Sequence, residues 1–354
     1  MKKYFITGGC GFIGSNFIHF LLEDGFSSQI INLDKMTYAG NKDNLSTIGR
    51  DDNYYFIKGD ICNQSNVQDI LEKYNPDVIV HFAAESHVDR SIDGPVKFVN
   101  TNIVGTMNLL NETNKWLKRL GREKKDNFRF VHISTDEVYG SLGAEGKFLE
   151  STPYDPSSPY SASKAGSDHL VRSWFRTFDF PAIITNCSNN YGPYQFPEKL
   201  IPLMIINCIK GKKLPVYGTG LNIRDWLYVR DHCEAIQTVI DKGKLGETYN
   251  IGGNNEITNI KIVNDICSIL DSKVPKKNGR SFSEQITFVD DRPGHDFRYA
   301  IDATKIENKL GWKPKENFET GIKKTILWYL NNKEWWEKIQ KLNYKQERLG
   351  VISK

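Results

Sequence analysis

The sequence predicts an α/β fold in which a doubly wound parallel sheet is followed by a smaller α/β carboxyl-terminal domain. Short apolar segments alternate with helix-like segments through the first half of the 354-residue chain, and this alternation is typical of a parallel sheet covered on both faces. A glycine-rich turn joins the first strand-like segment to the first helix-like segment. After about Asn190 the alternation becomes irregular, which indicates a second, smaller unit.

The predicted strands are short buried runs, and the predicted helices place apolar residues about 3.6 positions apart. The strands are Lys3–Thr7, Gln29–Asp34, Tyr54–Lys58, Asp77–Phe82, Phe128–Ser134 and Ala182–Cys187. The helices are Phe12–Glu23, Val96–Leu120 and about Tyr160 to Thr177. Gly121–Asn127 is expected to be a charged loop, and Asn331–Lys354 a solvated helix. The Gly-, Ser- and Pro-rich segment Gly140–Pro159 reads as a long loop for which we consider a role as a lid.

Composition argues against several classes of protein. The net charge of +4 is small and comes without a basic arm, so nucleic acid is not an expected partner. No apolar run approaches the roughly 20 residues of a membrane span. The six cysteines are scattered, without C-x-x-C pairs or His/Cys clusters, which predicts no metal site and a reducing cytoplasm. His132, in an apolar strand, is expected to be a core residue.

The amino-terminal turn has the pattern of a dinucleotide site. Gly8-Gly9-Cys10-Gly11-Phe12-Ile13-Gly14 satisfies G-x-x-G-x-x-G and, from Gly9, G-x-G-x-x-G. Glycines allow a tight turn and a close approach of the backbone to a pyrophosphate at the helix amino terminus. Asp34, 20 residues after Gly14, ends the second strand, where a carboxylate binds ribose hydroxyls and repels a 2′-phosphate. NAD is therefore favoured over NADP, although the neighbouring Lys35 weakens this argument.

These motifs give the predicted domain boundaries. We assign residues 1–190 to an NAD-binding Rossmann domain and residues 191–354 to a substrate-binding domain, with residues 229–251 returning to the first. Gly59-Asp60-Ile61, after the third strand, is placed either to meet the adenine or to form a simple turn.

Two further motifs indicate the chemistry. Tyr160 and Lys164 are four residues apart, so on a helix they share one face. An ammonium beside a phenol lowers the pKa of the phenol, which then can accept the proton of an alcohol. Thr135-Asp136-Glu137 adds an acid and a base that simple alcohol oxidation does not need. Each motif alone is more often structural, a helix surface or a strand-end cap, but their joint position behind a nucleotide site favours an enzyme.

Together these segments resemble the extended short-chain dehydrogenase/reductase family, and within it the 4,6-dehydratases that act on dTDP-glucose. The acid pair is the discriminating feature, because related nucleotide-sugar epimerases carry small residues there. The matched segments are Gly8–Ser15, Asp34–Gly40, Ala83–Ile92, Thr101–Thr106, Ser134–Gly140, Tyr160–Lys164, Asn189–Pro193, Arg224–Val229 and Arg292–Asp302.

The resemblance implies an NAD-dependent hydro-lyase and a role for each catalytic residue. Tyr160 would be the base for the carbon-4 hydroxyl, Lys164 would bind the nicotinamide ribose, and Thr135 would orient the same hydroxyl. The carbon-4 ketone acidifies the carbon-5 proton, which Glu137 would remove, while Asp136 would protonate the departing carbon-6 hydroxyl. For this purpose the pKa of Asp136 must be raised by burial or by Glu137.

The resemblance also implies binding residues and an assembly. The implied NAD-binding residues are Gly8, Gly11, Phe12, Ile13, Gly14, Asp34, Lys35, Thr37, Asp60, Ile61, Ala83, Ala84, Thr101, Tyr160, Lys164 and Asn189. The implied substrate-binding residues are Glu85, Ser86, Thr135, Asn190, Lys199, Leu200, Pro215, Val216, Tyr217, Arg224, Asn259, Arg292 and His295. Among them, Arg224 would grip the pyrophosphate in bidentate fashion and Tyr217 would offer the thymine a flat face. A homodimer through helices Val96–Leu120 and Tyr160–Thr177 is implied, with dTDP-glucose as partner in cytoplasmic deoxysugar (rhamnose-type) synthesis.

Two alternatives stay open at this stage. A nucleotide-sugar 4-epimerase would share the cofactor, Tyr160 and Lys164, and the acid pair argues against it. A cofactor-sensing regulatory or scaffold protein would be expected to have lost Tyr160 or Lys164, and both are present.

Overall fold

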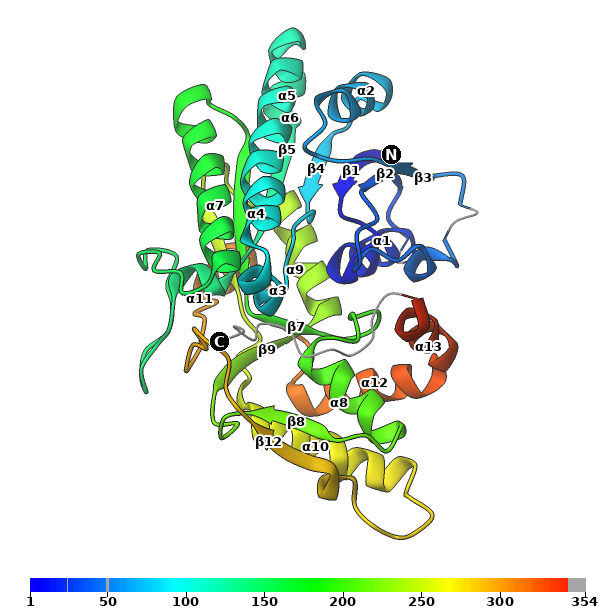
Figure 1. The fold of residues 1–354 in the computed structure, drawn as a ribbon. Helices are drawn as coiled ribbons and strands as arrows, with labels where there is room; N and C mark the ends of the chain where they lie inside the picture. Colours follow the sequence, from blue (N-terminus) through cyan, green and yellow to red (C-terminus); the bar gives the residue numbers. More distant parts are fainter. Residues whose placement is uncertain (24, 49–50, 343–354) are drawn as a thin grey trace.

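A computed structural model describes residues 1–23, 25–48 and 51–342, and its main element is a seven-stranded, wholly parallel sheet (Figure 1). The predicted fold class is thereby confirmed. The order changes direction between β1 and β4, and such a switch point opens a crevice at the carboxyl ends of the strands. In spatial order the strands are β10 (Thr248–Ile251), β6 (Ala182–Cys187), β5 (Arg129–Thr135), β4 (Val78–His81), β1 (Lys2–Thr7), β2 (Ser28–Asp34) and β3 (Tyr54–Lys58).

Helices cover both faces of this sheet, because successive residues of each strand point to opposite sides. Tyr4 and Ile6 of β1 share an apolar core with α1 (Phe12–Glu23) and α9 (Val229–Lys242). Phe5, between them, belongs to a second core with three helices that lie on the other face (Figure 1). These three are α2 (Gln64–Tyr74), α5 (Thr106–Arg119) and α7 (Pro159–Phe178).

Helix α7 has clear start and stop signals. Ser158 and Ser161 bond each other's backbone in a capping box, and Pro159 takes the first helical position. Asp179 ends the helix with φ of 51°. The helix therefore projects Tyr160 from its first turn.

Two predictions around the preceding helix need correction. Residues 96–120 are not one regular α-helix: α4 (Pro95–Phe98) leads into a π-helical segment, Val99–Gly105, and then into α5. The side chain of Asn102, inside the π-helical segment, bonds both the N–H and the carbonyl of Glu85. Gly121–Asn127 is not a loop, because Arg122–Asn127 form the short helix α6, in which the Lys124 ammonium pairs with Asp77.

The long segment 140–159 is packed rather than free. Phe148 is buried, and its N–H donates to the carbonyl of Ala300 at 2.8 Å, while Leu142 bonds Arg298. No residue of this segment lines the main cavity of the described chain, so the structure gives no support to a lid.

The smaller unit lies below the carboxyl edge of the sheet in Figure 1. It contains two small sheets. One has three strands, in the order β11 (Glu256–Thr258), β9 (Ile223–Tyr228) and β7 (Asn189–Tyr191), and the other pairs β12 (Ile286–Val289) with β8 (Leu214–Tyr217). Its helices are α8 (Leu200–Ile209), α10 (Asn259–Lys273), α12 (Phe318–Asn331) and α13 (Lys333–Leu342), around a core that includes Tyr191, Trp226 and Trp336.

Segments from late in the sequence lie with the large sheet. Strand β10 is its edge strand, and α9 packs on α1. The division at residues 190 and 191 stays a prediction. Of the helix expected at 331–354, α13 is seen with Trp336 buried, and residues 343–354 lie outside the described part. The remaining short α-helices of the described residues are α3 (Val88–Asp93) and α11 (Thr304–Leu310).

Among the described helices, none combines the length and the apolar character that crossing a membrane requires. Within the same residues, no cluster of three His, Cys, Asp or Glu side chains is arranged to hold a metal ion.

Candidate active site

A cavity of about 470 Å³ lies where the carboxyl ends of the parallel strands face the smaller unit. Every residue that the sequence analysis assigned to cofactor or substrate lines it, and so do four of the five residues assigned to catalysis. The exception is Asp136, which is buried beside the cavity and 1% exposed. Residues more than 280 positions apart in the sequence therefore meet in one place.

The glycine turn is shaped as a cradle. Gly8 has φ of +74°, and a Cβ there would lie 2.7 Å from the backbone of Ala83. A Cβ on Gly14 would lie 2.5 Å from the carbonyl oxygen of Gly8. Side chains are thus excluded at the amino terminus of α1, where backbone N–H groups favour a phosphate. This space fits the pyrophosphate of a dinucleotide.

Asp34 is positioned at the end of β2 as predicted. Its carboxylate accepts hydrogen bonds from the N–H groups of Cys10, at 2.9 Å, and Met36, at 2.7 Å. Lys35 pairs with Asp60 at 2.7 Å. Because Asp60 holds the Lys35 ammonium, the one residue that weakened the preference for NAD over NADP is already neutralised by a neighbour.

Tyr160 and Lys164 both lie on the inner face of α7, but their electrostatics differ from the prediction. Burial raises the pKa of Tyr160 well above its ordinary value, Glu137 raises it further, and a hydrogen bond with Thr135 lowers it. Lys164 donates from Nζ to the carbonyl of Ile133 at 2.8 Å, and burial lowers its own pKa. The expectation that Lys164 brings the pKa of Tyr160 down toward working pH is therefore wrong, because desolvation dominates.

The acid pair occupies a one-turn 3₁₀ helix, Asp136–Tyr139, directly after β5. The Thr135 hydroxyl caps it by accepting a hydrogen bond from the Glu137 N–H at 3.3 Å. Burial, Glu137 and then Asp225 raise the pKa of Asp136 well above its usual value. This outcome agrees with the requirement stated for a general acid, and Asp136 Oδ2 has no hydrogen-bond partner among the described residues.

Glu137 faces the cavity under opposing influences. Burial raises its pKa, whereas the cations Arg292, Lys199 and Arg224 oppose this rise. The two neighbouring carboxyls are consequently different, since Asp136 is enclosed and Glu137 is exposed to three positive charges. When the environments of two carboxyls differ in this way, their pKa values differ, and one carboxyl can act as the acid and the other as the base.

The substrate end of the cavity is rich in cations that are already engaged. Arg292 pairs with Asp89 at 2.8 Å, and Lys199 donates to the Ser86 carbonyl at 3.1 Å. Arg224 donates to the carbonyls of Ile223, Asp296 and Phe297 and stacks on Tyr299 at 4.3 Å. These carbonyls occupy part of the Arg224 fork, so its predicted bidentate grip on a pyrophosphate stays a prediction.

The polar residues that line the cavity and were not assigned from the sequence include His87, Asp89 and Glu198. Glu198 is 8% exposed and accepts hydrogen bonds from Tyr38, at 2.9 Å, and Arg90, at 3.0 Å. His87 and Asp89 belong to the matched segment Ala83–Ile92, and Glu198 adjoins Lys199. Their position beside assigned residues was the signal available in the sequence.

Comparison with known proteins adds to this geometry. Residues 5–325 match the family model described as GDP-mannose 4,6 dehydratase. The chain is 55% identical over 361 aligned positions to a dTDP-glucose 4,6-dehydratase of Escherichia coli, with 99% of each covered. It is similar to the crystal structure of dTDP-glucose 4,6-dehydratase from Bacillus anthracis in complex with NAD, with 46% identity, a TM-score of 0.85, and 96% and 100% of the two chains covered.

An epimerase is a more distant neighbour. The UDP-glucose 4-epimerase of Thermotoga maritima, solved with UDP-glucose, is 25% identical with a TM-score of 0.81 over 93% of this chain and 99% of its own. The fold alone therefore does not separate the two activities, and the residues of the site must do so.

Proposed function

We propose roles for the residues of this cavity from the premise that the chain belongs to the extended short-chain dehydrogenase/reductase family and, within it, to the dTDP-glucose 4,6-dehydratases, which are NAD-dependent hydro-lyases. One observation carries the assignment. Tyr160, Thr135 and Glu137 face the same cavity as the glycine cradle, while Asp136 is enclosed beside them with a raised pKa.

The cofactor is NAD, and the residues of the cradle fit it. Gly8, Gly11 and Gly14 would admit the pyrophosphate, Asp34 would bind the adenosine ribose, and Lys164 the nicotinamide ribose. When bound, NAD supplies the acceptor for a hydride from carbon 4 of the sugar and the donor of that hydride to carbon 6.

Tyr160 and Thr135 would act on the carbon-4 hydroxyl. Their side chains interact, so one hydroxyl group of the substrate can contact both. Tyr160 takes the proton of the hydroxyl as carbon 4 becomes a ketone, and Lys164 contributes positive charge on the same face of α7. Because burial raises the pKa of Tyr160, the phenol must first give its own proton to solvent, a loss that the positive charge of Lys164 favours, before it can take the proton of the substrate.

Glu137 and Asp136 would carry out the elimination. The ketone acidifies the carbon-5 proton, which Glu137 would accept. Burial raises the pKa of Glu137 overall, which makes it a stronger base, and three nearby cations limit that rise. Asp136, kept protonated by burial, gives its proton to the carbon-6 hydroxyl as it leaves as water. Glu137 then returns a proton to carbon 5 as carbon 6 is reduced, so the base regains its initial state. Asp136 is left ionised and recovers a proton from solvent, which balances the one that Tyr160 took from the carbon-4 hydroxyl and releases.

The nucleotide end of the substrate would lie against the smaller unit. Arg224, Arg292 and Lys199 supply positive charge for the pyrophosphate. Tyr217, whose ring meets His295 edge-to-face at 6.3 Å, would offer a flat aromatic face to thymine. Asn190, Asn259 and the segment 215–217 complete the proposed contacts, with Glu85 and Ser86 near the sugar.

Three broader proposals follow from family membership. The protein acts as a homodimer, its product enters deoxysugar synthesis of the rhamnose type, and it works in the cytoplasm. The first is supported by exposed apolar side chains on α4 and α5. The scattered free cysteines agree with a reducing compartment.

An isotope experiment tests the assignment. dTDP-glucose carrying deuterium at carbon 4 is expected to give a 4-keto-6-deoxy product with that deuterium at carbon 6. Reaction in heavy water should place deuterium at carbon 5, since Glu137 exchanges its proton with solvent. NMR and mass spectrometry of the product measure both. Deuterium retained at carbon 4 with inverted configuration would instead establish the epimerase alternative.

A further inference from the structure

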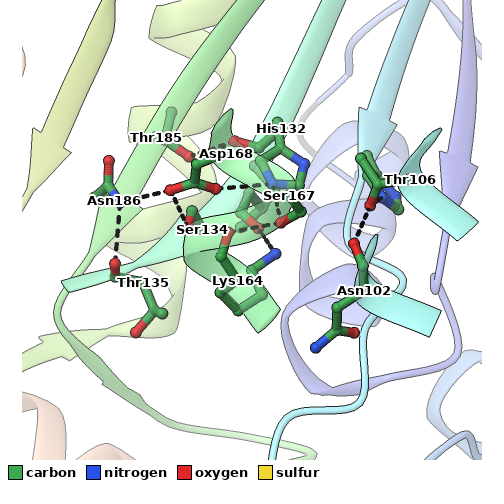
Figure 2. Close-up of polar contacts among 12 residues, drawn as sticks. Asn102, Thr106, His132, Ser134, Thr135, Lys164, Ser167, Asp168, Thr185 and Asn186 are labelled. Atoms are coloured by element: carbon green, nitrogen blue, oxygen red, sulfur yellow. Dashed lines mark hydrogen bonds and ion pairs between the residues drawn. The ribbon is translucent and has the colours of Figure 1, made fainter. Parts of the chain in front are cut away.

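A fully buried carboxylate lies behind the catalytic residues and has no part in the proposed chemistry. Asp168 is on α7, four residues after Lys164, so both face the sheet one turn apart. Its relative exposure is 0%. Figure 2 shows it pointing from α7 toward β5 and β6, with interactions to residues of both strands.

Both oxygens of Asp168 face residues of β5. Oδ2 accepts a hydrogen bond from the Ser134 hydroxyl at 2.8 Å, and Oδ1 lies 3.0 Å from Nε2 of His132. Ser134 immediately precedes Thr135. The carboxylate is therefore tied to the strand end from which the Thr135-Asp136-Glu137 segment starts.

A second connection reaches the same segment through β6. The Asn186 amide donates to the carbonyl of Thr135 at 3.0 Å and to Asp168 Oδ2 at 3.4 Å (Figure 2). On the helix side, the Ser167 hydroxyl donates to the carbonyl of Lys164 and lies 3.1 Å from His132 Nε2. One polar cluster thus spans both parts of the catalytic machinery.

Two groups of this cluster, Lys164 and Asp168, are charged near pH 7. Burial raises the pKa of Asp168, but the hydrogen bond from His132 and the charges of His132 and Lys164 bring it below its ordinary value. Burial and then the charge of Lys164 lower the pKa of His132 to about 4, so its ring is neutral near pH 7. Lys164 and Asp168 are then the two opposite charges buried in the cluster, and each acts on the other through its charge.

We infer that Asp168 is a positioning residue that holds the Tyr160/Lys164 face of α7 in register with the Thr135-Asp136-Glu137 segment and serves as the buried counter-charge of Lys164. The inference rests on the proposed function and deepens it. Oxidation and elimination use different side chains, and Asp168 contacts the supports of both. A shift of about 1 Å in such supports is enough to cost about 10² in rate.

Other ionisable groups face this pair from the surrounding elements. Those that interact with Lys164 or Asp168 are His132 on β5, His81 on β4, Cys187 on β6, and Tyr154 and Tyr139, and Arg172 bonds the Tyr154 hydroxyl. Burial lowers the pKa of His81, and burial raises the pKa of Cys187 to a value above the working range. Asp168 is accordingly the group in this set that carries a compensating negative charge at neutral pH.

The test compares Asp168→Asn with the wild-type holoenzyme. The variant is expected to lower kcat about 10²-fold while KM and bound NAD stay unchanged. Transfer of deuterium from carbon 4 measures the oxidation step, and uptake of deuterium at carbon 5 measures the elimination step. Both should be slower in the variant, because both parts of the site lose alignment. The alkaline limb of the kcat profile should move to lower pH by about one unit or more, since Lys164 without its counter-charge loses its proton more readily.

Two further variants separate the inference from a general loss of stability. Ser134→Ala removes one tether and keeps the charge, so kcat should fall about tenfold with an unmoved alkaline limb. Asp231→Asn removes a buried carboxylate that accepts the Glu316 N–H at 2.9 Å, and should lower thermal stability without moving the limb.

Specific results would overturn the inference. The inference is contradicted if Asp168→Asn keeps the wild-type kcat or if the alkaline limb of its pH profile does not move. It is also contradicted if the alkaline limb moves equally in Asp231→Asn. If Asp168→Asn does not fold, wild-type kcat in Ser134→Ala contradicts it. A wild-type enzyme that forms no 4-keto-6-deoxy product refutes the proposed function instead, so the two failures are distinguishable.

Discussion

At the scale of single residues, the two acidic side chains after β5 divide into an enclosed acid and an accessible base. Asp136 is absent from the cavity lining, and its pKa is raised by burial, Glu137 and Asp225. A carboxyl in this setting is neutral when its neighbour Glu137 is ionised. In the proposed mechanism, this arrangement gives dehydration its own proton donor, separate from Tyr160, which we propose to serve oxidation.

Asp136→Asn should therefore uncouple the two half-reactions. Oxidation at carbon 4 should persist, while loss of water should slow by about 10²–10⁴, the usual contribution of one general acid. In single-turnover experiments the near-ultraviolet absorbance of reduced nicotinamide should accumulate. Tyr160→Phe is the matched control, because it should block the first step and give no such signal. Dehydration at the wild-type rate in Asp136→Asn would show that another group is the acid.

The raised pKa of Asp136 also predicts a pH-dependent cost to stability. The folded state retains this proton where the unfolded chain, with a carboxyl pKa of about 4, has lost it. Stability contributed by this group is thus lost as pH rises from about 4 through the folded pKa. Asp136→Asn should raise the melting temperature, and the gain should be larger at pH 8 than at pH 4. Calorimetry at both values measures it, and equal gains at both would contradict the argument.

At the scale of secondary structure elements, the start of α1 depends on the absence of side chains. A Cβ on Gly14 would lie 2.5 Å from the Gly8 carbonyl and 2.8 Å from Gly9 Cα, both backbone atoms that cannot move aside. Gly143, by contrast, has nothing within 4 Å of its Cβ position and an ordinary φ.

Gly14→Ala should therefore yield protein without bound NAD, and added NAD should restore little activity. Gly143→Ala should copurify with NAD as the wild type does. Ultraviolet spectra of the denatured supernatants and reverse-phase chromatography quantify the released cofactor. Full NAD content in Gly14→Ala would mean that the turn does not hold the pyrophosphate.

What the sequence predicts at this scale follows from local signals. The glycines, the buried strands and the caps of α7 are encoded within a few residues, so six strands of the large sheet and the helices α1 and α7 are recovered, whereas α2 is not. The π-helical segment 99–105 depends on Asn102 meeting Glu85 across the fold, and no periodicity encodes that. Likewise Tyr160 and Lys164 are found from their spacing, but the raised pKa of Tyr160 comes from burial by distant residues. His132 is predicted as a core residue, whereas its partner Asp168 is invisible until the helix meets the strand.

At the scale of the whole molecule, the two units are joined around the cofactor side of the cavity. Trp335 of α13 donates to Asn44 at 2.8 Å, and Lys338 pairs with Asp43, so the end of the smaller unit contacts the loop that follows Asp34. Tyr38 from the same loop bonds Glu198 of the opposite wall. Contacts from both sides thus enclose the proposed adenosine site, in keeping with a cofactor that remains bound through turnover.

The assembly can be tested on the outer surface of α4, the π-helical segment and α5. Val96, Val99, Val104 and Met107 are 68%, 45%, 41% and 43% exposed. Apolar area removed from water contributes about 25 cal/mol per Å², and stable interfaces bury about 1,200–2,000 Å² in total. A row of apolar side chains on adjoining helical segments is suited to such an interface. Sedimentation velocity of the wild type is expected to give the mass of two chains.

Val104→Asp should shift that equilibrium toward one chain, because a charge at the centre of the proposed interface would be buried without a partner. Leu327→Asp is the matched control: Leu327 on α12 is 42% exposed, but it lies outside the proposed interface, so the dimer should persist. If Val104→Asp remains dimeric at the lowest measurable concentration, the subunits meet through another surface. If the wild type sediments as a single chain, then the proposed homodimer is wrong and the exposed side chains of this face serve another purpose.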